Sequence, residues 1–375
     1  MAKKHADAYS RLVRILILLF VLVVVCGVGY ALANASITAQ QEENAARARQ
    51  ENDRQQQAWQ QVVREEQARY LEETAVVWPE PKGEAWEIVD LSQYPVQNSI
   101  SISVDRDALM MEGMMLVNHW HAVPSDFPED ELVSMKSVDK TVPVSGSSVK
   151  LFPNAAYALS QMLAGAKEAG LENYLIEEAY RTKETQQGHY DKEAANYANR
   201  FSGDPLVAKV RQNVNVPGTS EYQSGLSFRI DRWLKGDAAF NEPKFQTTEH
   251  SDWLLDNSWK YGFVFRFPVE GYPNASMQDK SYKTGESKKL SVYRYVGVPH
   301  ASIMHQMNFC MEEYIEYLME HPHIAIYENG QKVYEITWQP LNHLGNSVYV
   351  EYDRKAVDYS VSMDNVGGVI TCMTF

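Results

Sequence analysis

Histidine is the residue type in this sequence that most directly suggests chemistry. Ten histidines are present, and neutral imidazole is both a common metal ligand and a general base near neutral pH. His189 and Glu193 are four residues apart, which places them on one face of a predicted helix. No third ligand at a recognisable spacing accompanies the other close pairs, which are His119/His121, His300/His305 and His321/His323. The pattern favours surface or packing histidines over a metal site.

Cysteine is too scarce to form a disulfide framework, because the chain of 375 residues holds three. Cys26 follows three valines, so we expect it to be an ordinary apolar residue of its segment. For Cys310 and Cys372 two alternatives stay open, one disulfide or two free buried thiols. The sequence gives no distance between these two residues.

The charge balance is strongly acidic, with 35 Lys and Arg against 49 Asp and Glu and a net charge of −14. A nucleic-acid binder needs a basic face for phosphates, so this balance argues against such a partner. The hydrophobic fraction of 45% is typical of a folded protein rather than a disordered one. The length indicates roughly two to three modules.

Residues 15–33 are predicted to form a transmembrane anchor. They read ILILLFVLVVVCGVGYALA, without a charge, which is long enough to cross ~30 Å of hydrocarbon as a helix. Four basic residues lie within residues 1–14, so this segment is predicted to be cytoplasmic and the rest of the chain to lie outside. A cleaved signal peptide is the rival interpretation, because residues 33–35 resemble a cleavage site. The length of the apolar run favours an uncleaved anchor.

Residues 34–77 are predicted to be a polar helical stalk. The segment from Gln40 to Glu73 lacks Gly and Pro and is rich in good helix formers. Its best heptad seam is poorly apolar, which favours a solvated spacer helix over a coiled coil that binds a protein partner. Prolines at 79 and 81 then begin a linker, predicted over residues 78–98.

The remaining chain has the mixed periodicity of an α+β protein. A domain is predicted over residues 99–320, followed by a β-rich extension over 321–375. The extension holds a hairpin in which Asn329 and Gly330 supply the two turn residues of positive φ. Strands are predicted at 99–104, 174–176, 226–230 and 262–268, and helices at 154–169, 183–200, 249–261 and 301–319.

Six segments follow one another in an order and spacing that identify a family. They are MLVNHWHAVPSDFPEDEL from Met115, AYRTKETQQ from Ala179, PGTSEYQSGLSFRID from Pro217, WLLDNSWKYGFVFRFP from Trp253, TG at Thr284 and RYVG from Arg294. Together they resemble the VanY-type D-alanyl-D-alanine carboxypeptidases, zinc peptidases that trim the stem peptide of bacterial peptidoglycan. The resemblance covers residues 115–318. It implies a small antiparallel sheet with flanking helices, here with a C-terminal β-hairpin extension.

The resemblance implies a zinc site, from which this sequence departs at every catalytic position. In the family motif SxHxxGxAxD, Tyr222 stands at the His position and Arg229 at the Asp position. In the motif EPWHxRYVG, Lys289 occupies the position of the Glu that acts as general base, and Val292 occupies the position of the His. A catalytic zinc needs three N or O ligands and one open position. We therefore expect no zinc cofactor and assign no catalytic residue.

Several positions near the family's substrate are retained or have become cationic. The resemblance suggests five candidate substrate-binding residues, which are Arg181, Gln186, Ser220, Arg229 and Lys289. One hypothesis is a metal-free pocket that binds an anionic group, such as the carboxylate of a stem peptide. In the alternative, Arg229 and Lys289 pair with local carboxylates such as Asp231 and Glu221 and fill the former site.

Three functions follow from these interpretations. The first is a pseudoenzyme that binds or regulates at peptidoglycan stem peptides. The second is an active D,D-carboxypeptidase in peptidoglycan remodelling whose site is unlike that of the family. The third is a scaffold that meets a protein partner through its stalk. All three describe a single-pass protein of the bacterial cytoplasmic membrane with its C-terminal domain outside.

Overall fold

The computed structural model of this 375-residue chain describes residues 13–14, 16–29, 47, 50–66, 78–146, 149–341 and 347–375. The segments 16–29 and 50–66 are helical. The predicted cytoplasmic segment, anchor and stalk lie partly outside the described residues. Within the described ranges, no helix is both long enough and apolar enough to cross a membrane. The described residues from Trp78 onward form one compact unit.

A four-stranded antiparallel sheet lies at the centre of this unit, as predicted. Its strand order is β5-β6-β8-β7, and every neighbouring pair is antiparallel. The strands are β5 (Tyr174–Glu178), β6 (Ser227–Arg232), β7 (Phe263–Phe265) and β8 (Val292–Tyr295). Phe228 and Ile230 of β6 belong to the same buried apolar cluster as Leu159 and Met162 of the predicted helix 154–169. This cluster joins sheet and helix into one core.

The helix that covers this sheet is α4 (Pro153–Glu168), and its sequence accounts for its limits. Pro153 stands at the first helical position, where its missing N–H costs no hydrogen bond. Buried Ala155, Leu159, Met162 and Ala166 recur every three or four residues and form one apolar stripe. After the helix, Gly170 adopts a φ of +87°, which a residue with a side chain rarely does.

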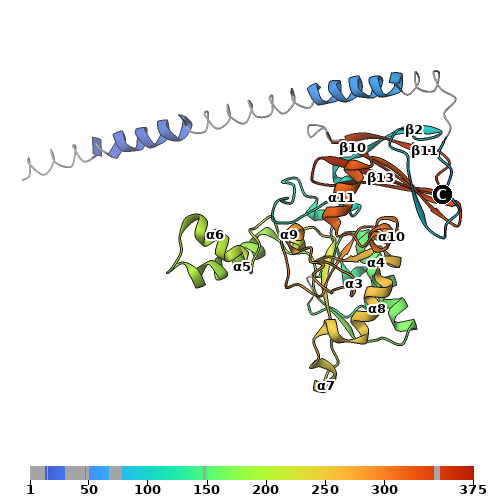
Figure 1. The fold of residues 1–375 in the computed structure, drawn as a ribbon. Helices are drawn as coiled ribbons and strands as arrows, with labels where there is room; N and C mark the ends of the chain where they lie inside the picture. Colours follow the sequence, from blue (N-terminus) through green and yellow to red (C-terminus); the bar gives the residue numbers. More distant parts are fainter. Residues whose placement is uncertain are drawn as a thin grey trace, which may run out of the picture. The chain divides into compact units, whose positions relative to one another are not determined.

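A pair of helices, α5 (Lys183–Tyr197) and α6 (Gly203–Arg211), projects from the body of the unit (Figure 1). The side chain of Thr182 caps α5 by accepting a hydrogen bond from the backbone N–H of Thr185, at 3.1 Å. The connection between β5 and α5 contains Arg181. This cap fixes where α5 begins, and so it fixes the position of Arg181 at the end of the sheet.

The predicted helix over 301–319 is two helices, α10 (Val298–Met307) and α11 (Met311–Glu320), so that prediction was wrong. Asn308 ends α10 in the left-handed conformation, with a φ of +56°. Asn is one of the few residues that adopt it readily. Glu313 then accepts a hydrogen bond from the backbone N–H of Cys310 and caps the start of α11.

The C-terminal region forms a larger sheet than the predicted hairpin. The hairpin exists, with Asn329 and Gly330 at φ of +51° and +78°. It is part of a five-stranded sheet of order β1-β9-β10-β13-β12. The strands are β1 (Glu87–Asp90), β9 (His323–Glu328), β10 (Gln331–Pro340), β12 (Asp358–Met363) and β13 (Gly368–Thr374). The region predicted as a linker, 78–98, therefore contains a strand of this sheet.

A second long-range pairing joins the start and the end of the unit. Strand β2 (Ser99–Asp105) pairs with β11 (Ser347–Asp353) in antiparallel register. The remaining elements are α2 (Arg106–Met111), η1 (Glu129–Glu131), β3 (Val133–Ser134), α3 (Met135–Val138), β4 (Lys150–Leu151), η2 (Glu221–Gln223), α7 (Ala238–Asn241), η3 (Phe245–Thr247), α8 (Glu249–Asn257), η4 (Ser258–Tyr261) and α9 (Ser281–Thr284).

The C-terminal sheet shares its core with the rest of the unit. Met304 of α10 and Ile315 of α11 belong to the same buried cluster as Ile336 of β10 and Cys372 of β13. Cys310 and Cys372 are both free and buried, and burial raises the pKa of each thiol. Of the two alternatives left open by the sequence, free thiols are the one observed.

A substitution in this shared core is expected to destabilise the whole unit. Ile336 is fully buried, and Ile336→Ala should lower the free energy of unfolding by about 2–5 kcal/mol. Urea unfolding should still follow one transition, because both regions use one core. Val357→Ala is the control, since Val357 is 77% exposed. A separate early transition of the C-terminal sheet would contradict the shared core.

Candidate functional site

Strand pairing brings together the positions that the resemblance assigns to the zinc site. Arg229 of β6 lies opposite Val292 of β8 and opposite Glu178 of β5. Tyr222 lies in η2, the short helix that precedes β6. The backbone N–H of Arg181 donates to the carbonyl of Tyr222, at 2.7 Å. The predicted site is therefore one place in the fold.

Apolar packing occupies the centre of this place. Tyr222, Phe267 and Val292 form a buried cluster, here called the Tyr222 cluster. Burial raises the pKa of the Tyr222 phenol, so the hydroxyl stays neutral. Val292 is fully buried and has no donor atom. At the family's two histidine positions, this chain thus presents a neutral phenol and an isopropyl group.

Each cation around the Tyr222 cluster has its own carboxylate. Arg229 Nε lies 3.1 Å from Glu177 Oε2, and Lys289 Nζ lies 2.7 Å from Glu286 Oε2. Arg181 Nη2 lies 2.5 Å from Glu178 Oε1. These three pairs are charge-neutral. Local pairing is what one of the two sequence hypotheses proposed, and it leaves no excess of positive charge at the site.

The partners named in that hypothesis, Asp231 and Glu221, were wrong. The side chain of Asp231 accepts from the backbone N–H of Arg232. Glu221 points into the core, where it meets two other arginines. Glu221 was a wrong choice because its side chain points into the core. Asp231 lies on the same face of β6 as Arg229, but the guanidinium pairs across the sheet with Glu177 instead.

Two of the candidate binding residues form a joint arrangement beside Tyr222. Arg181 Nη1 donates to Gln186 Oε1 at 2.6 Å, and the guanidinium carbon lies 4.7 Å from the centre of the Tyr222 ring. Lys289 Nζ approaches the same ring at 5.8 Å and donates to Asn215 Oδ1 at 3.1 Å. The structure therefore places Arg181, Gln186 and Lys289 close to one ring, that of Tyr222.

Ser220, the fifth candidate, carries an unsatisfied polar atom. Its Oγ is buried and has no hydrogen-bond partner among the described residues. A buried hydroxyl without a partner is costly, at about 1–3 kcal/mol. Ser220 lies two residues before Tyr222 and is 1% exposed, so a ligand would reach this hydroxyl only if the side chains that cover it moved.

Next to the Tyr222 cluster lies a buried ion network that the sequence analysis did not predict. Its members are Glu221, Arg266, Arg294 and Glu312. Arg266 Nε donates to Glu221 Oε2 at 2.7 Å, and Arg294 Nη1 donates to Glu221 Oε1 at 2.6 Å. The Arg266 guanidinium also holds both oxygens of Glu312, at 2.8 and 3.0 Å. The network contains two positive and two negative side chains.

A signal for this network exists in the sequence. Arg266 and Arg294 each interrupt a strand-like run of apolar and aromatic residues, FVFRFP and VYRYVG. A guanidinium in such a run is buried and therefore needs buried carboxylate partners. The partners themselves could not be chosen, because Glu221 and Glu312 are far away in the chain.

The residues at the family's ligand positions do not fit a zinc ion. Tyr222 is a neutral phenol, Arg229 is a cation paired with Glu177, and Val292 has no donor. Zinc requires deprotonated or neutral N, O or S donors. Among the residues that the structure describes, no three His, Cys, Asp or Glu side chains are grouped so as to hold a metal ion.

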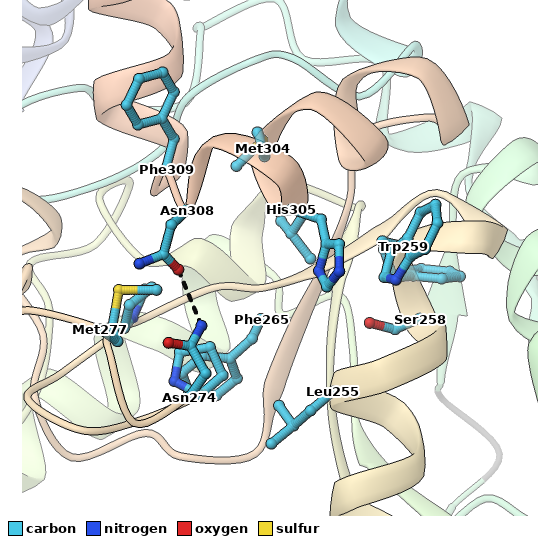
Figure 2. A pocket seen from close by; sticks show the side chains of 14 residues that line it. Leu255, Ser258, Trp259, Phe265, Asn274, Met277, Met304, His305, Asn308 and Phe309 are labelled. Atoms are coloured by element: carbon cyan, nitrogen blue, oxygen red, sulfur yellow. Dashed lines mark hydrogen bonds between the residues drawn. The ribbon is translucent and has the colours of Figure 1, made fainter. Parts of the chain in front are cut away.

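The paired histidines make the contacts of packing residues. His305 stacks on Trp259, with ring centres 4.8 Å apart (Figure 2). Glu193, the predicted helical neighbour of His189, accepts from the side-chain amides of Asn196 and Asn213. Hydrogen bonds join His119 to Gly285 O, His121 to Asn118 Oδ1, His300 to the Tyr314 hydroxyl, His321 to Asp90 and His323 to Glu335.

Comparison with known proteins finds similarity to one family. Residues 148–284 match the family model described as VanY: D-alanyl-D-alanine carboxypeptidase. A D-alanyl-D-alanine carboxypeptidase of Enterococcus faecium is 27% identical over 277 residues, which cover 73% of this chain and 79% of that protein. The bifunctional D-Ala-D-Ala dipeptidase and D-Ala-D-Ala carboxypeptidase VanXYC of Enterococcus gallinarum is 26% identical over 211 residues, which cover 56% of this chain and 97% of that protein.

A solved structure shares the fold. The vancomycin resistance D,D-dipeptidase VanXYg, in complex with a D-Ala-D-Ala phosphinate analog, superposes with a TM-score of 0.56 at 21% identity. The match covers 74% of this chain and 99% of that one. This chain therefore shares the fold of that solved structure. The chain is related to the VanY-type D-alanyl-D-alanine carboxypeptidases, and the resemblance inferred from its motifs is confirmed.

Removing one member of the buried ion network is expected to be severely destabilising. Glu221→Gln leaves Arg266 and Arg294 without their shared carboxylate, and the free energy of unfolding should fall by about 3–5 kcal/mol. Urea unfolding measures the change. Glu168→Gln is the control, because Glu168 is exposed on α4. A loss no greater than that of the control would mean that the network contributes little.

The stability difference between the wild type and Glu221→Gln is expected to depend on pH. Burial alone would raise the pKa of Glu221, but Arg266 and Arg294 lower it to about 2. A depressed carboxyl pKa stabilises the fold above the unfolded value of about 4.3, and this contribution is lost as the pH falls towards 2. The stability difference between wild type and Glu221→Gln should be constant above pH ~5 and shrink between about 4.3 and 2. A difference independent of pH would contradict this assignment.

Proposed function

We propose that this protein is a non-hydrolytic D-Ala-D-Ala carboxypeptidase-like protein of the bacterial cell envelope, which binds peptidoglycan stem peptides without cleaving them. The observation that supports the proposal is the Tyr222 cluster, which contains the two residues that the resemblance assigns to the family's histidine positions. Hydrolysis in the family needs a metal-bound water and a carboxylate that takes its proton. This chain offers neither at the corresponding positions.

Lys289 is the residue that argues most strongly against hydrolysis. It stands at the position of the general base, and its ammonium group is paired with Glu286. An ammonium group has three donors and no acceptor, so it cannot take a proton from water. The carboxylate of Glu286 is engaged in turn, because Lys289 and the backbone N–H groups of residues 287 and 288 hold its pKa below its usual range despite burial.

Binding of a stem peptide is supported by what remains at the substrate side. Arg181 and Gln186 are joined by a hydrogen bond, and the Arg181 side chain is 12% exposed. A terminal carboxylate can take the place of Glu178 on this guanidinium through charge-assisted hydrogen bonds. The matched relatives are named for action on D-Ala-D-Ala.

The proposal also includes a single-pass anchor over residues 15–33 and an outside location for the compact unit. The uncharged run and the basic residues before it support both. Peptidoglycan lies outside the cytoplasmic membrane, so this topology would place the binding site on the same side as its ligand.

The absence of hydrolysis is directly measurable. With added zinc, the wild type is expected to release D-Ala from a D-Ala-D-Ala-terminated pentapeptide no faster than buffer does. The matched variant combines Tyr222→His, Arg229→Asp, Lys289→Glu and Val292→His, and it should gain binding of about one zinc per chain. Release of D-Ala by the wild type at a rate that depends on its concentration would overturn the proposal.

Binding is tested separately by calorimetric titration with the same peptide. Arg181→Ala should weaken binding by about 10- to 100-fold, the effect of losing a hydrogen bond to a charged group. Arg200→Ala is the control, because Arg200 contacts Tyr197 on the projecting helices. If the wild type does not bind the peptide, or if both variants bind it equally well, the stem peptide is not the ligand of this site.

A further inference from the structure

Four exposed apolar side chains converge on one cavity away from the Tyr222 cluster. Trp120 is 60% exposed and Tyr282 is 67% exposed. With Met319 and Val366, which are also exposed, they line a cavity of about 280 Å³, here called the Trp120 cavity. Its walls come from the loop after Val117, from α9, from α11 and from the turn between β12 and β13. Exposed apolar residues that gather in this way mark a binding site.

The volume of the Trp120 cavity indicates a small ligand. At about 280 Å³ it is just below the ~300–1,000 Å³ range of small-molecule pockets. A stable protein partner would instead bury about 800 Å² of surface on each side. The pocket drawn in Figure 2 is much smaller than the Trp120 cavity, with a volume of about 60 Å³. There Asn274 donates to Asn308, and the space is large enough for only a few water molecules.

The charged groups of the Trp120 cavity are already balanced. Lys283 and Glu316 pair with each other at the rim. At the floor, both oxygens of Glu312 are held by Arg266, and one of them also accepts from Asn118. A charged ligand would have to displace one of these paired groups, whereas a neutral ligand would displace none. The balance favours a neutral ligand.

The polar edge of the Trp120 cavity offers both hydrogen-bond donors and acceptors. Asn118 Oδ1 accepts from the backbone N–H groups of Trp120 and His121. It lies 3.0 Å from His121 Nδ1, so Nδ1 carries the proton. Burial lowers the pKa of His121, and the neutral ring presents Nε2 as an acceptor. Lys283 supplies donors at the rim.

We propose that the Trp120 cavity binds a neutral saccharide ring. Such a ring has an apolar face of C–H groups, which would pack on Trp120 and Tyr282, and an edge of hydroxyls, which would meet His121 Nε2 and the Lys283–Glu316 pair. The two aromatic side chains are rigid and lose little conformational entropy on binding. The proposal does not depend on stem-peptide binding, because it uses none of the residues around Tyr222.

Calorimetric titration of the full chain with two neutral oligosaccharides tests the proposal. Triacetylchitotriose carries the acetamide groups of a cell-wall glycan, and cellotriose does not, so the two ligands separate the possible sources. At least one should bind. Trp120→Ala should weaken that binding by at least about tenfold, in line with the loss of an aromatic contact and its buried area. Trp120→Phe should retain most of it.

Trp233→Ala is the matched control, because Trp233 is similarly exposed but lies outside the cavity. It should bind the oligosaccharide like the wild type, and thermal unfolding should show that all variants are folded. Failure of both oligosaccharides to bind would overturn the proposal. So would an equal loss in Trp120→Ala and Trp233→Ala. A concentration-dependent dimer that Trp120→Ala abolishes would assign the surface to a second copy of the chain instead.

Discussion

The buried ion network of Glu221, Arg266, Arg294 and Glu312 is the constraint on which the rest of the structure depends. Four ionised side chains in a protein interior are tolerated only when every charge is paired and every donor is used. Here Arg294 also donates to the carbonyls of Gly113 and Met115, and Ser227 donates to Glu221. The network thereby holds four parts of the chain together through hydrogen bonds. These are η2, β8, α11 and the segment after α2.

This network separates two surfaces with different chemistry. On one side it fixes η2, and with it the Tyr222 cluster and its three neutral ion pairs. On the other side, Glu312 forms the floor of the Trp120 cavity and Asn118 holds His121 in position. A metal site would have needed the first surface to present lone pairs to an ion. The positions that the resemblance assigns to the zinc site instead hold an aromatic ring, a valine and paired charges.

Local features of the fold were predictable, and features that depend on distant residues were not. The apolar stripe of α4 and the Asn329-Gly330 turn depend on residues close together in the sequence, so periodicity and turn-residue preferences were enough to predict them. The pairing of β1 with β9 and of β2 with β11 joins segments more than two hundred residues apart, and no local pattern encodes it. The break between α10 and α11 was missed because both helices share an apolar stripe, and Asn308 alone interrupts it.

The same distinction between local and long-range features applies to the candidate site. Motif order was enough to place Arg181, Tyr222, Arg229 and Lys289 in one region, because the family's spacing is retained. The partners of the new cations depend on side-chain direction across β5 and β6, which sequence spacing does not give. Glu177 and Glu178 precede Arg181 closely in the chain, yet their pairing with Arg229 and Arg181 is visible only once the strands are in register.

We propose that apolar packing stands in this chain where the related carboxypeptidases would hold a metal. Anomalous X-ray diffraction at the zinc edge, from crystals grown with excess zinc, is the decisive measurement. We expect no anomalous peak within coordination distance, about 2.0–2.3 Å, of Tyr222, Arg229 or Lys289. A fully occupied peak there, with Tyr222 or a rearranged carboxylate as ligand, would contradict it.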